Sequence, residues 1–235
     1  SVDYIQLERK ELDKKKGVIK WDKNNYPPVP EKYMFDMYSR IIKREGHVRF
    51  VNNILKASND YVKFINPPND DIHMLGFRAM GVNKCFPLFL NTILKLSQSN
   101  FKKVVIEIEK LTFRHSILRN DPKELERFYY DLCHEIKSDD NVNEGLMKIA
   151  KHQNFRDEDK FKNEFVLSSP KMSISKMILD RICRKVSESI DWSNKDVHIE
   201  HVMPQTPDGQ WLILAKDKEV YKDYLNRLGN LTILQ

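Results

Sequence analysis

Cysteine is scarce in this chain, which has three cysteines in 235 residues. Cys85, Cys133 and Cys183 are far apart, and each lies in an apolar stretch with helical spacing. An odd and scattered set excludes a disulfide framework and provides no Cys-x-x-Cys pattern for zinc. We therefore expect free thiols inside the fold and a reducing, cytoplasmic environment.

Glycine is also scarce, with seven residues, and none of them form a phosphate-binding loop or a nucleophile elbow. These absences exclude a nucleotide-hydrolysing site and a serine-hydrolase site within this chain. Long apolar runs are missing as well, because no stretch approaches the roughly 20 residues that cross a bilayer. The first residues lack the pattern of a secretory signal peptide, so we expect no membrane partner.

Charged residues are abundant, at 31% of the chain beside 40% hydrophobic residues, which is typical of a globular domain. The net charge of +6 is compatible with a nucleic-acid partner without establishing one. The length allows one large domain, or one domain with a small appended unit. Composition therefore favours a globular protein and leaves the function open.

Residues 1–30 are predicted to be a charged N-terminal segment that ends in a proline-rich connector. Lys14, Lys15 and Lys16 are consecutive, and we expect a solvated helix face or arm there, with a phosphate contact as the alternative. Three prolines between residues 27 and 30 prevent a helix and favour an extended chain.

Residues 31–191 are predicted to form a multi-helix bundle, because apolar residues recur there at helical spacing. We expect roughly eight to ten helices joined by short connections, and no strand before Val197. Asp70-Asp71 and Asp121-Pro122 are typical helix starts. The segment from Phe86 to Leu96 is apolar on nearly all sides, which predicts a buried helix.

Residues 192–235 show a different pattern and are predicted to form a small separate unit, which makes the fold class mainly α. Val197 and Ile199 alternate with polar residues, which indicates a short half-buried strand that ends near Pro204. A short helix is expected near residues 219–227. A final strand from Asn230 to Leu234 is expected to pair antiparallel with the first.

Two histidines and a carboxylate in the first of these strands are the candidate reactive groups. His198 and His201 are three residues apart, and on a strand such residues point to opposite faces. This argues against a paired zinc chelate, which would need the two rings on one face of a helix. A zinc-dependent hydrolase on these two histidines stays open only as a minor alternative. His201 beside Glu200 is suited to acid–base or metal chemistry.

The sequences IEHVMPQ (residues 199–205) and RLGNLTIL (residues 227–234), with Trp211 between them, resemble a known family. They are similar to the C-terminal HNH-type (His-Me finger) nuclease domain of GmrSD-type, modification-dependent restriction endonucleases. The preceding helices, from about Tyr33, resemble the helical region of those proteins. The resemblance implies a ββα unit built around one divalent metal ion, and a metal-dependent DNA endonuclease from a phage-defence system.

Site roles follow from the resemblance, position by position. His201 resembles the general base that activates water, and Glu200 resembles the acidic residue that helps to hold the metal, Mg²⁺ or Mn²⁺. Asn230 resembles the asparagine that braces the loop and orients the histidine. His198 and Gln205 are expected to support the site by packing or hydrogen bonding.

The resemblance also implies partners and a longer protein. The expected partners are DNA, possibly modified, and an N-terminal NTP-using domain of the same full-length protein. The family motif continues into a helix that would follow Gln235, so we expect the unit to be incomplete in this chain and the fragment to cut DNA poorly. The alternative is a non-catalytic helical interaction or regulatory module with a degenerate motif.

Overall fold

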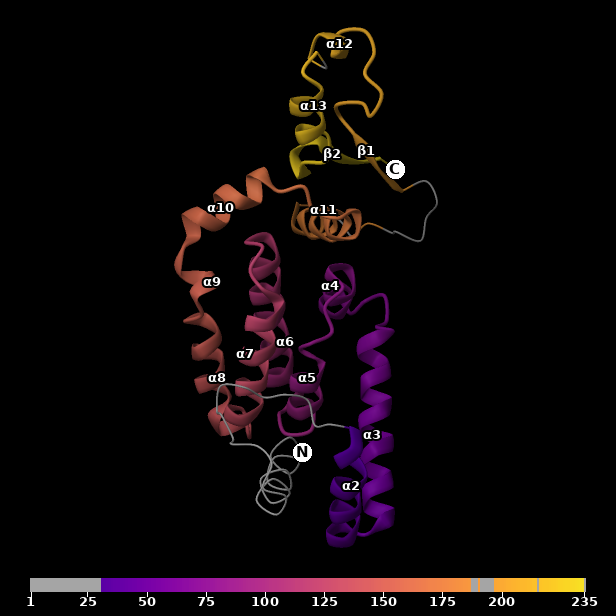
Figure 1. The fold of residues 1–235 in the computed structure, drawn as a ribbon, viewed down its shortest axis with the longest axis vertical. Helices are drawn as coiled ribbons and strands as arrows, with labels where there is room; N and C mark the ends of the chain where they lie inside the picture. Colours follow the sequence, from indigo (N-terminus) through magenta and orange to yellow (C-terminus); the bar gives the residue numbers. More distant parts are fainter. Residues whose placement is uncertain (1–30, 187–189, 191–196, 215, 235) are drawn as a thin grey trace. The chain divides into compact units, whose positions relative to one another are not determined.

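The computed structural model describes residues 31–186, 190, 197–214 and 216–234, and these residues are mainly helical. The two strands described, β1 (His198–His201) and β2 (Leu231–Leu234), pair in one small sheet. This confirms the predicted mainly α fold and the position of both strands (Figure 1). Within the described ranges, no helix is both long and apolar enough to cross a membrane. The predictions for residues 1–30 lie outside the described residues.

The chain divides into two compact units that are discontinuous in sequence. The first unit comprises Ser1–Met74, Asn83–Ile108 and Asp121–Ala150, and the second comprises Leu75–Val82, Glu109–Asn120 and Lys151–Gln235. The helices α4 and α6 therefore each contribute residues to both units. The predicted division at residues 191 and 192 stays a prediction, since residues 187–189 and 191–196 lie outside the described part of the chain.

Helices of the first unit follow the predicted apolar periodicity. Two of them begin at the predicted aspartates, because Asp71 accepts a hydrogen bond from the Met74 amide at 3.0 Å and Asp121 accepts one from the Lys123 amide at 2.9 Å. Such side-chain caps satisfy amides that have no partner inside the helix. The elements are α2 (Glu31–Glu45), α3 (His47–Ile65), the start of α4 (Ile72–Met80), α5 (Phe86–Ile93), the first half of α6 (Gln98–Ile117), α7 (Pro122–Glu135), the 3₁₀ helix η1 (Asp139–Asn141) and α8 (Val142–Ala150).

The core of the first unit lies around α5, as its apolar sequence predicts. Leu88 and Phe89 are fully buried, and Leu132 on α7 is buried as well. The Asn91 amide donates to the Cys133 carbonyl at 3.0 Å, which satisfies a polar group inside this core. All three cysteines are free thiols, as expected, and burial raises the pKa of Cys85.

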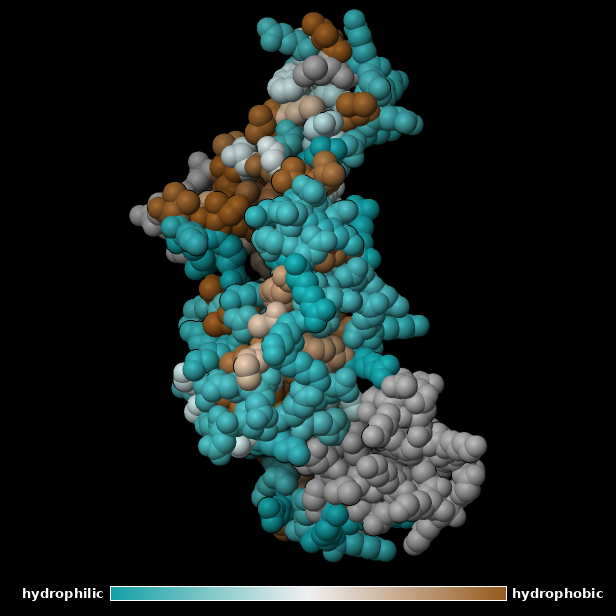
Figure 2. Space-filling model, turned by 90° about the vertical axis from the view of Figure 1, so that its left-hand side faces the viewer, coloured by the Kyte–Doolittle hydropathy of each residue, from teal (hydrophilic) through white to brown (hydrophobic). Residues whose placement is uncertain are grey.

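The second unit contains the small sheet and the helices around it. Two four-residue helices, α9 and α12, were not predicted. Large hydrophobic side chains such as Val166, Leu167 and Ile213 are exposed, and hydrophobic surface is visible in the upper part of Figure 2. The elements are the ends of α4 and α6, α9 (Gln153–Arg156), α10 (Glu158–Leu167), α11 (Met172–Val186), β1 (His198–His201), α12 (Trp211–Leu214), α13 (Lys218–Leu225), the 3₁₀ helix η2 (Leu228–Asn230) and β2 (Leu231–Leu234).

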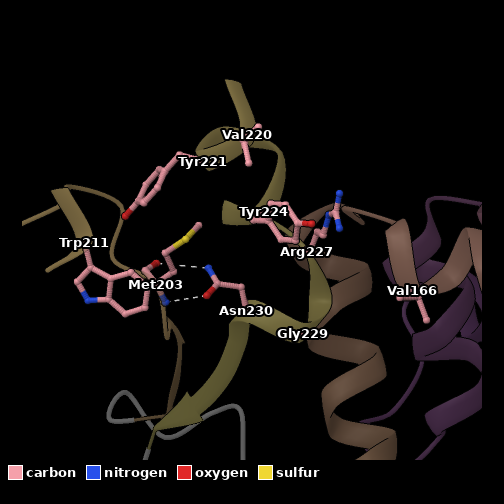
Figure 3. A pocket seen from close by; sticks show the side chains of 9 residues that line it. All are labelled: Val166, Met203, Trp211, Val220, Tyr221, Tyr224, Arg227, Gly229 and Asn230. Atoms are coloured by element: carbon pink, nitrogen blue, oxygen red, sulfur yellow. Dashed lines mark hydrogen bonds between the residues drawn. The ribbon is translucent and has the colours of Figure 1, made fainter. Parts of the chain in front are cut away.

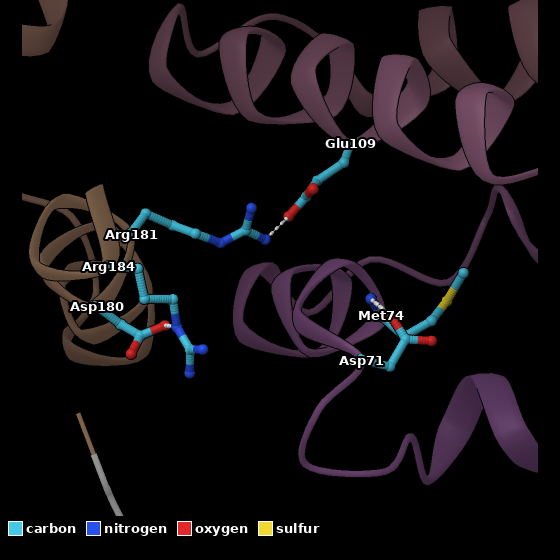
Figure 4. A network of polar contacts seen from close by, with 6 residues as sticks. All are labelled: Asp71, Met74, Glu109, Asp180, Arg181 and Arg184. Carbon is cyan, nitrogen blue, oxygen red and sulfur yellow. Dashed lines mark hydrogen bonds and ion pairs between the residues drawn. The ribbon is translucent and has the colours of Figure 1, made fainter. Parts of the chain in front are cut away.

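Ion pairs connect the helices of the second unit. Arg181 on α11 pairs with the buried Glu109 on α6, and Arg184 pairs with Asp180 at 2.7 Å within α11 (Figure 4). Gly76 on α4 lies against the same carboxylate, and a Cβ built there would be 2.0 Å from Glu109 Oε1. The glycine therefore leaves the space that the Glu109 side chain occupies.

Arg114, near the end of α6, holds the segment that contains α9 and α10. Its Nε donates to the Asn154 carbonyl at 2.7 Å, and its Nη1 pairs with Glu158 at 2.8 Å. The guanidinium also lies 4.0 Å from the ring centroid of Phe161. Arg114 therefore joins this segment to α6 by a hydrogen bond, an ion pair and a cation–π contact.

Candidate functional site

The candidate site is built on the small sheet formed by β1 and β2. The strands are antiparallel, with His198 opposite Leu234 and His201 opposite Leu231. One further bond extends the ladder, because the Val202 amide donates to the Asn230 carbonyl at 2.9 Å. The strand pairing therefore places the end of β1, where His201 lies, directly beside the start of β2, which Asn230 precedes.

The two faces of β1 differ in exposure, as strand alternation requires. His198 and Glu200 are exposed, whereas Ile199 and His201 are half-buried. His198 Nε2 lies 3.1 Å from Glu200 Oε1, so these two side chains contact each other on the exposed face. The two histidines are consequently on opposite faces, as predicted from the strand pattern, and Glu200 shares its face with His198.

His201 contacts a single polar side chain among the hydrogen bonds of the described residues. Its Nδ1 lies 3.3 Å from Nε2 of Gln205. In this amide orientation Nε2 of Gln205 can only donate, so the contact requires the neutral tautomer of His201 that carries its proton on Nε2. His201 Nε2 is buried and has no hydrogen-bond partner within the described residues. The structure thus places Gln205 next to His201 and leaves the lone pair on Nδ1.

Asn230 holds the loop that follows His201. Its Oδ1 accepts a hydrogen bond from the Met203 amide at 2.7 Å, and its Nδ2 donates to the Met203 carbonyl at 3.3 Å (Figure 3). The same Nδ2 donates to the Leu225 carbonyl at the end of α13, at 2.7 Å. One side chain therefore connects the loop after β1, the end of α13 and the start of β2.

Tyr221 holds the same loop from α13 and was not identified from the sequence. Its ring is buried, and its hydroxyl donates to the Pro204 carbonyl. Asp217 caps the start of α13 by accepting from the amides of Glu219 and Val220, both at 3.1 Å. A tyrosine three residues after the first helical residue is a common core pattern, so no sequence signal marked this contact.

A hollow of about 550 Å³ lies next to Asn230. Trp211, Tyr221 and Tyr224 supply aromatic walls (Figure 3). The Arg227 guanidinium lies 3.9 Å from the centroid of the Tyr224 ring. Trp211 lines this hollow together with Met203 of the loop that follows β1.

No group of three or more His, Cys, Asp or Glu side chains in the described part of the chain is gathered closely enough to hold a metal ion. Glu200 offers one exposed carboxylate, which is a suitable oxygen ligand for Mg²⁺ or Mn²⁺. Mg²⁺ commonly keeps several waters and takes only one or two carboxylates, so Glu200 fits as one ligand of such an ion. His198, on the same face, is its present partner.

A comparison with protein families finds a match in the part of the chain that contains this site. Residues 152–235 match the model of the family described as GmrSD restriction endonucleases, C-terminal domain. No curated protein and no solved structure matches the chain. The match confirms the resemblance to these restriction endonucleases from His152 onward, and for the helices before it the resemblance stays a prediction.

Proposed function

We propose that this chain is part of an HNH-type, metal-dependent DNA endonuclease of a modification-dependent restriction system that acts in phage defence. The observation that carries the proposal is the clamp of Asn230 on the Met203 backbone, inside the segment that matches the restriction-endonuclease family. A side chain that fixes the loop after His201 is what a catalytic histidine needs for a constant orientation.

His201 acts in this proposal as the general base that takes a proton from the attacking water. The accepting lone pair on Nδ1 faces the Gln205 amide at 3.3 Å, which is longer than a typical hydrogen bond. Water can therefore replace the amide at Nδ1. Until water replaces it, the Gln205 amide keeps the ring in the tautomer that leaves Nδ1 unprotonated.

Glu200 acts as one ligand of a divalent ion, Mg²⁺ or Mn²⁺, with the other positions taken by water and DNA phosphate. The ion, when bound, would stabilise negative charge on the phosphate and on the leaving 3′ oxygen. Glu200 Oε1 contacts His198, so the other carboxylate oxygen, Oε2, would bind the ion. His198 therefore supports the carboxylate from the side and does not touch the water.

The test is nicking of supercoiled plasmid by the full-length protein, with and without Mg²⁺ or Mn²⁺, on unmodified and base-modified DNA. We expect nicking that requires the ion and is lost on chelation. Binding of DNA without any nicking under all these conditions would contradict the proposal and support the alternative, a non-catalytic module with a degenerate motif.

A further inference from the structure

The α3 helix carries a row of residues that are alternately three and four positions apart, which is the spacing of the a and d positions of a coiled coil. Five of the six are aliphatic, and the remaining one is a small serine. We call this row the α3 seam. Its members are Val48, Val51, Leu55, Ser58, Val62 and Ile65.

The α3 seam faces solvent, while a different face of the helix packs on the core. The five aliphatic seam residues are 45% to 76% exposed. Phe64, which follows the other face, is buried and lies 5.6 Å from Phe86, measured between ring centroids. An apolar stripe at helical spacing normally packs against a partner, so a second exposed stripe on one helix marks an interaction surface.

Charged residues of α3 are kept off the seam. Arg49, Lys56 and Lys63 recur every seven residues beside it, and Lys63 pairs with Asp60 at 2.8 Å. The seam edges carry Asn52 and Asn59 on one side, and His47, Ile54 and Tyr61 on the other. A second copy would therefore meet no like charge along the seam, and a charged partner would find no complement there.

The seam is complementary to itself when two copies run antiparallel. A two-fold axis between residues 56 and 57 places Val48 opposite Ile65 of the other copy, and Val51 opposite its Val62. Leu55 then meets the small Ser58, which leaves space for the larger side chain. Antiparallel coiled coils pair a positions with d positions in this way, and a two-fold interface is the commonest in homo-oligomers.

We infer that a second copy of this chain covers the α3 seam, so that the protein forms an antiparallel two-helix dimer. A 19-residue helix is only about 28 Å long. The buried area is therefore below the roughly 800 Å² per partner of a standard interface, which predicts a weak, concentration-dependent dimer. This inference does not depend on nuclease activity.

The test is sedimentation velocity of the 235-residue chain over a hundredfold concentration range, with Val51→Glu, Val62→Lys and their equimolar mixture. Each variant alone should be monomeric, because the new charge faces an aliphatic residue of the partner. The mixture should dimerise again, because the introduced glutamate of one variant meets the introduced lysine of the other while the second contact stays native. Lys56→Glu, on the polar side of α3, is the control and should dimerise like the wild type.

Circular dichroism melts of each variant establish that loss of the dimer is not loss of the fold. A wild-type chain that is monomeric at all concentrations would overturn the inference. A dimer that survives Val51→Glu would show that another surface is used. Failure of the mixture to dimerise would overturn the antiparallel register, because a parallel pair would place the introduced glutamate against Val51 of the other copy and gain nothing on mixing.

Discussion

At the scale of single residues, Asn230 does more than any other side chain to hold the candidate site. It makes three hydrogen bonds, two to Met203 and one to Leu225. Asn230→Ala leaves these backbone groups without their partner, which typically costs about 1–3 kcal/mol for a buried group. We expect a lower melting temperature together with loss of nicking, measured by thermal melts and plasmid assays.

Asn230→Asp is the control for this substitution. The carboxylate can still accept from the Met203 amide but can no longer donate to the Met203 and Leu225 carbonyls, and its oxygen would repel them. It should therefore melt below wild type, which tests whether the donations of Nδ2 are needed. Equal melting temperatures for wild type and Asn230→Ala would contradict the bracing role.

Gly76 provides a second prediction at this scale. A methyl group there would meet the Glu109 carboxylate, which pairs with Arg181. Gly76→Ala should therefore displace Glu109 and destabilise the protein by about 1–3 kcal/mol. In a Glu109→Ala background the same substitution should cost much less, and denaturant titrations of the four proteins measure the difference. An equal cost in both backgrounds would show that Glu109 is not what Gly76 accommodates.

At the scale of elements, η1 caps the start of α6 through Asp139. The side-chain amide of Asn100 donates to Asp139 Oδ1 at 2.8 Å, and the backbone amide of Ser97 donates to the same oxygen at 3.0 Å. These bonds, that of Asn100 foremost, lower the pKa of Asp139 below its usual value. A lowered folded-state pKa means that the carboxylate adds stability above its unfolded pKa of about 3.9, and that this is lost as the pH falls further.

Asp139→Asn should therefore be less stable than wild type at neutral pH, and the difference should shrink as the pH falls below about 4. Urea unfolding at a series of pH values measures it. Asp140→Asn, at the neighbouring exposed residue, is the matched control and should show no such pH-dependent difference. A difference for Asp139→Asn that stays constant down to about pH 2, well below the unfolded pKa, would contradict the capping account.

Elements could be predicted from the sequence where apolar residues recur at regular spacing over several turns, or where a side chain caps the first turn. The starts of α4 and α7 are held by Asp71 and Asp121 as expected, and both strands lie where alternation placed them. The short helices α9 and α12 could not be predicted, because four residues are too few to show a period. The buried helix was predicted from Phe86 to Leu96, but α5 ends at Ile93 and Leu94 is its C-cap.

In the site, strand alternation predicted that His198 and His201 lie on opposite faces. Contacts between distant residues could not be predicted in this way. Tyr221 and Pro204 are 17 residues apart, and only the fold brings the hydroxyl to that carbonyl. The two-residue spacing of His198 and Glu200 on a strand allows their side chains to touch. The same spacing would also allow a Glu200 carboxylate without this contact, so the sequence did not predict it.

At the scale of the whole molecule, the matched domain does not stand alone. The family match begins at His152, yet the compact unit that contains it also includes residues 75–82 and 109–120. Arg114 is one connection, because it binds Asn154 and Glu158 of the matched segment, and the Glu109–Arg181 ion pair is another. Segments from three parts of the chain therefore support one unit.

Arg114→Ala should loosen α9 and α10 from the end of α6. The substitution removes the bond to the Asn154 carbonyl and leaves Glu158 and Phe161 without the guanidinium. Limited proteolysis of Arg114→Ala should then cut faster within residues 151–167. Arg119→Ala, at the end of the segment of residues 109–120, is the control and should leave the cutting rate unchanged. Unchanged cutting in Arg114→Ala would show that other contacts hold this segment.

The central claim is that His201 is the general base of a DNA-cutting site, and plasmid nicking by full-length wild type, His201→Ala and His198→Ala tests it most directly. Loss of a general base typically lowers the rate about a hundred- to ten-thousandfold. His201→Ala should lose nicking to that extent while its melting temperature and DNA affinity stay close to wild type, because affinity comes mainly from phosphate contacts. His198→Ala should keep much more activity, because His198 contacts the Glu200 carboxylate and does not take the proton from water. Nicking by His201→Ala at the wild-type rate, or an inactive His198→Ala beside an active His201→Ala, would contradict the assignment.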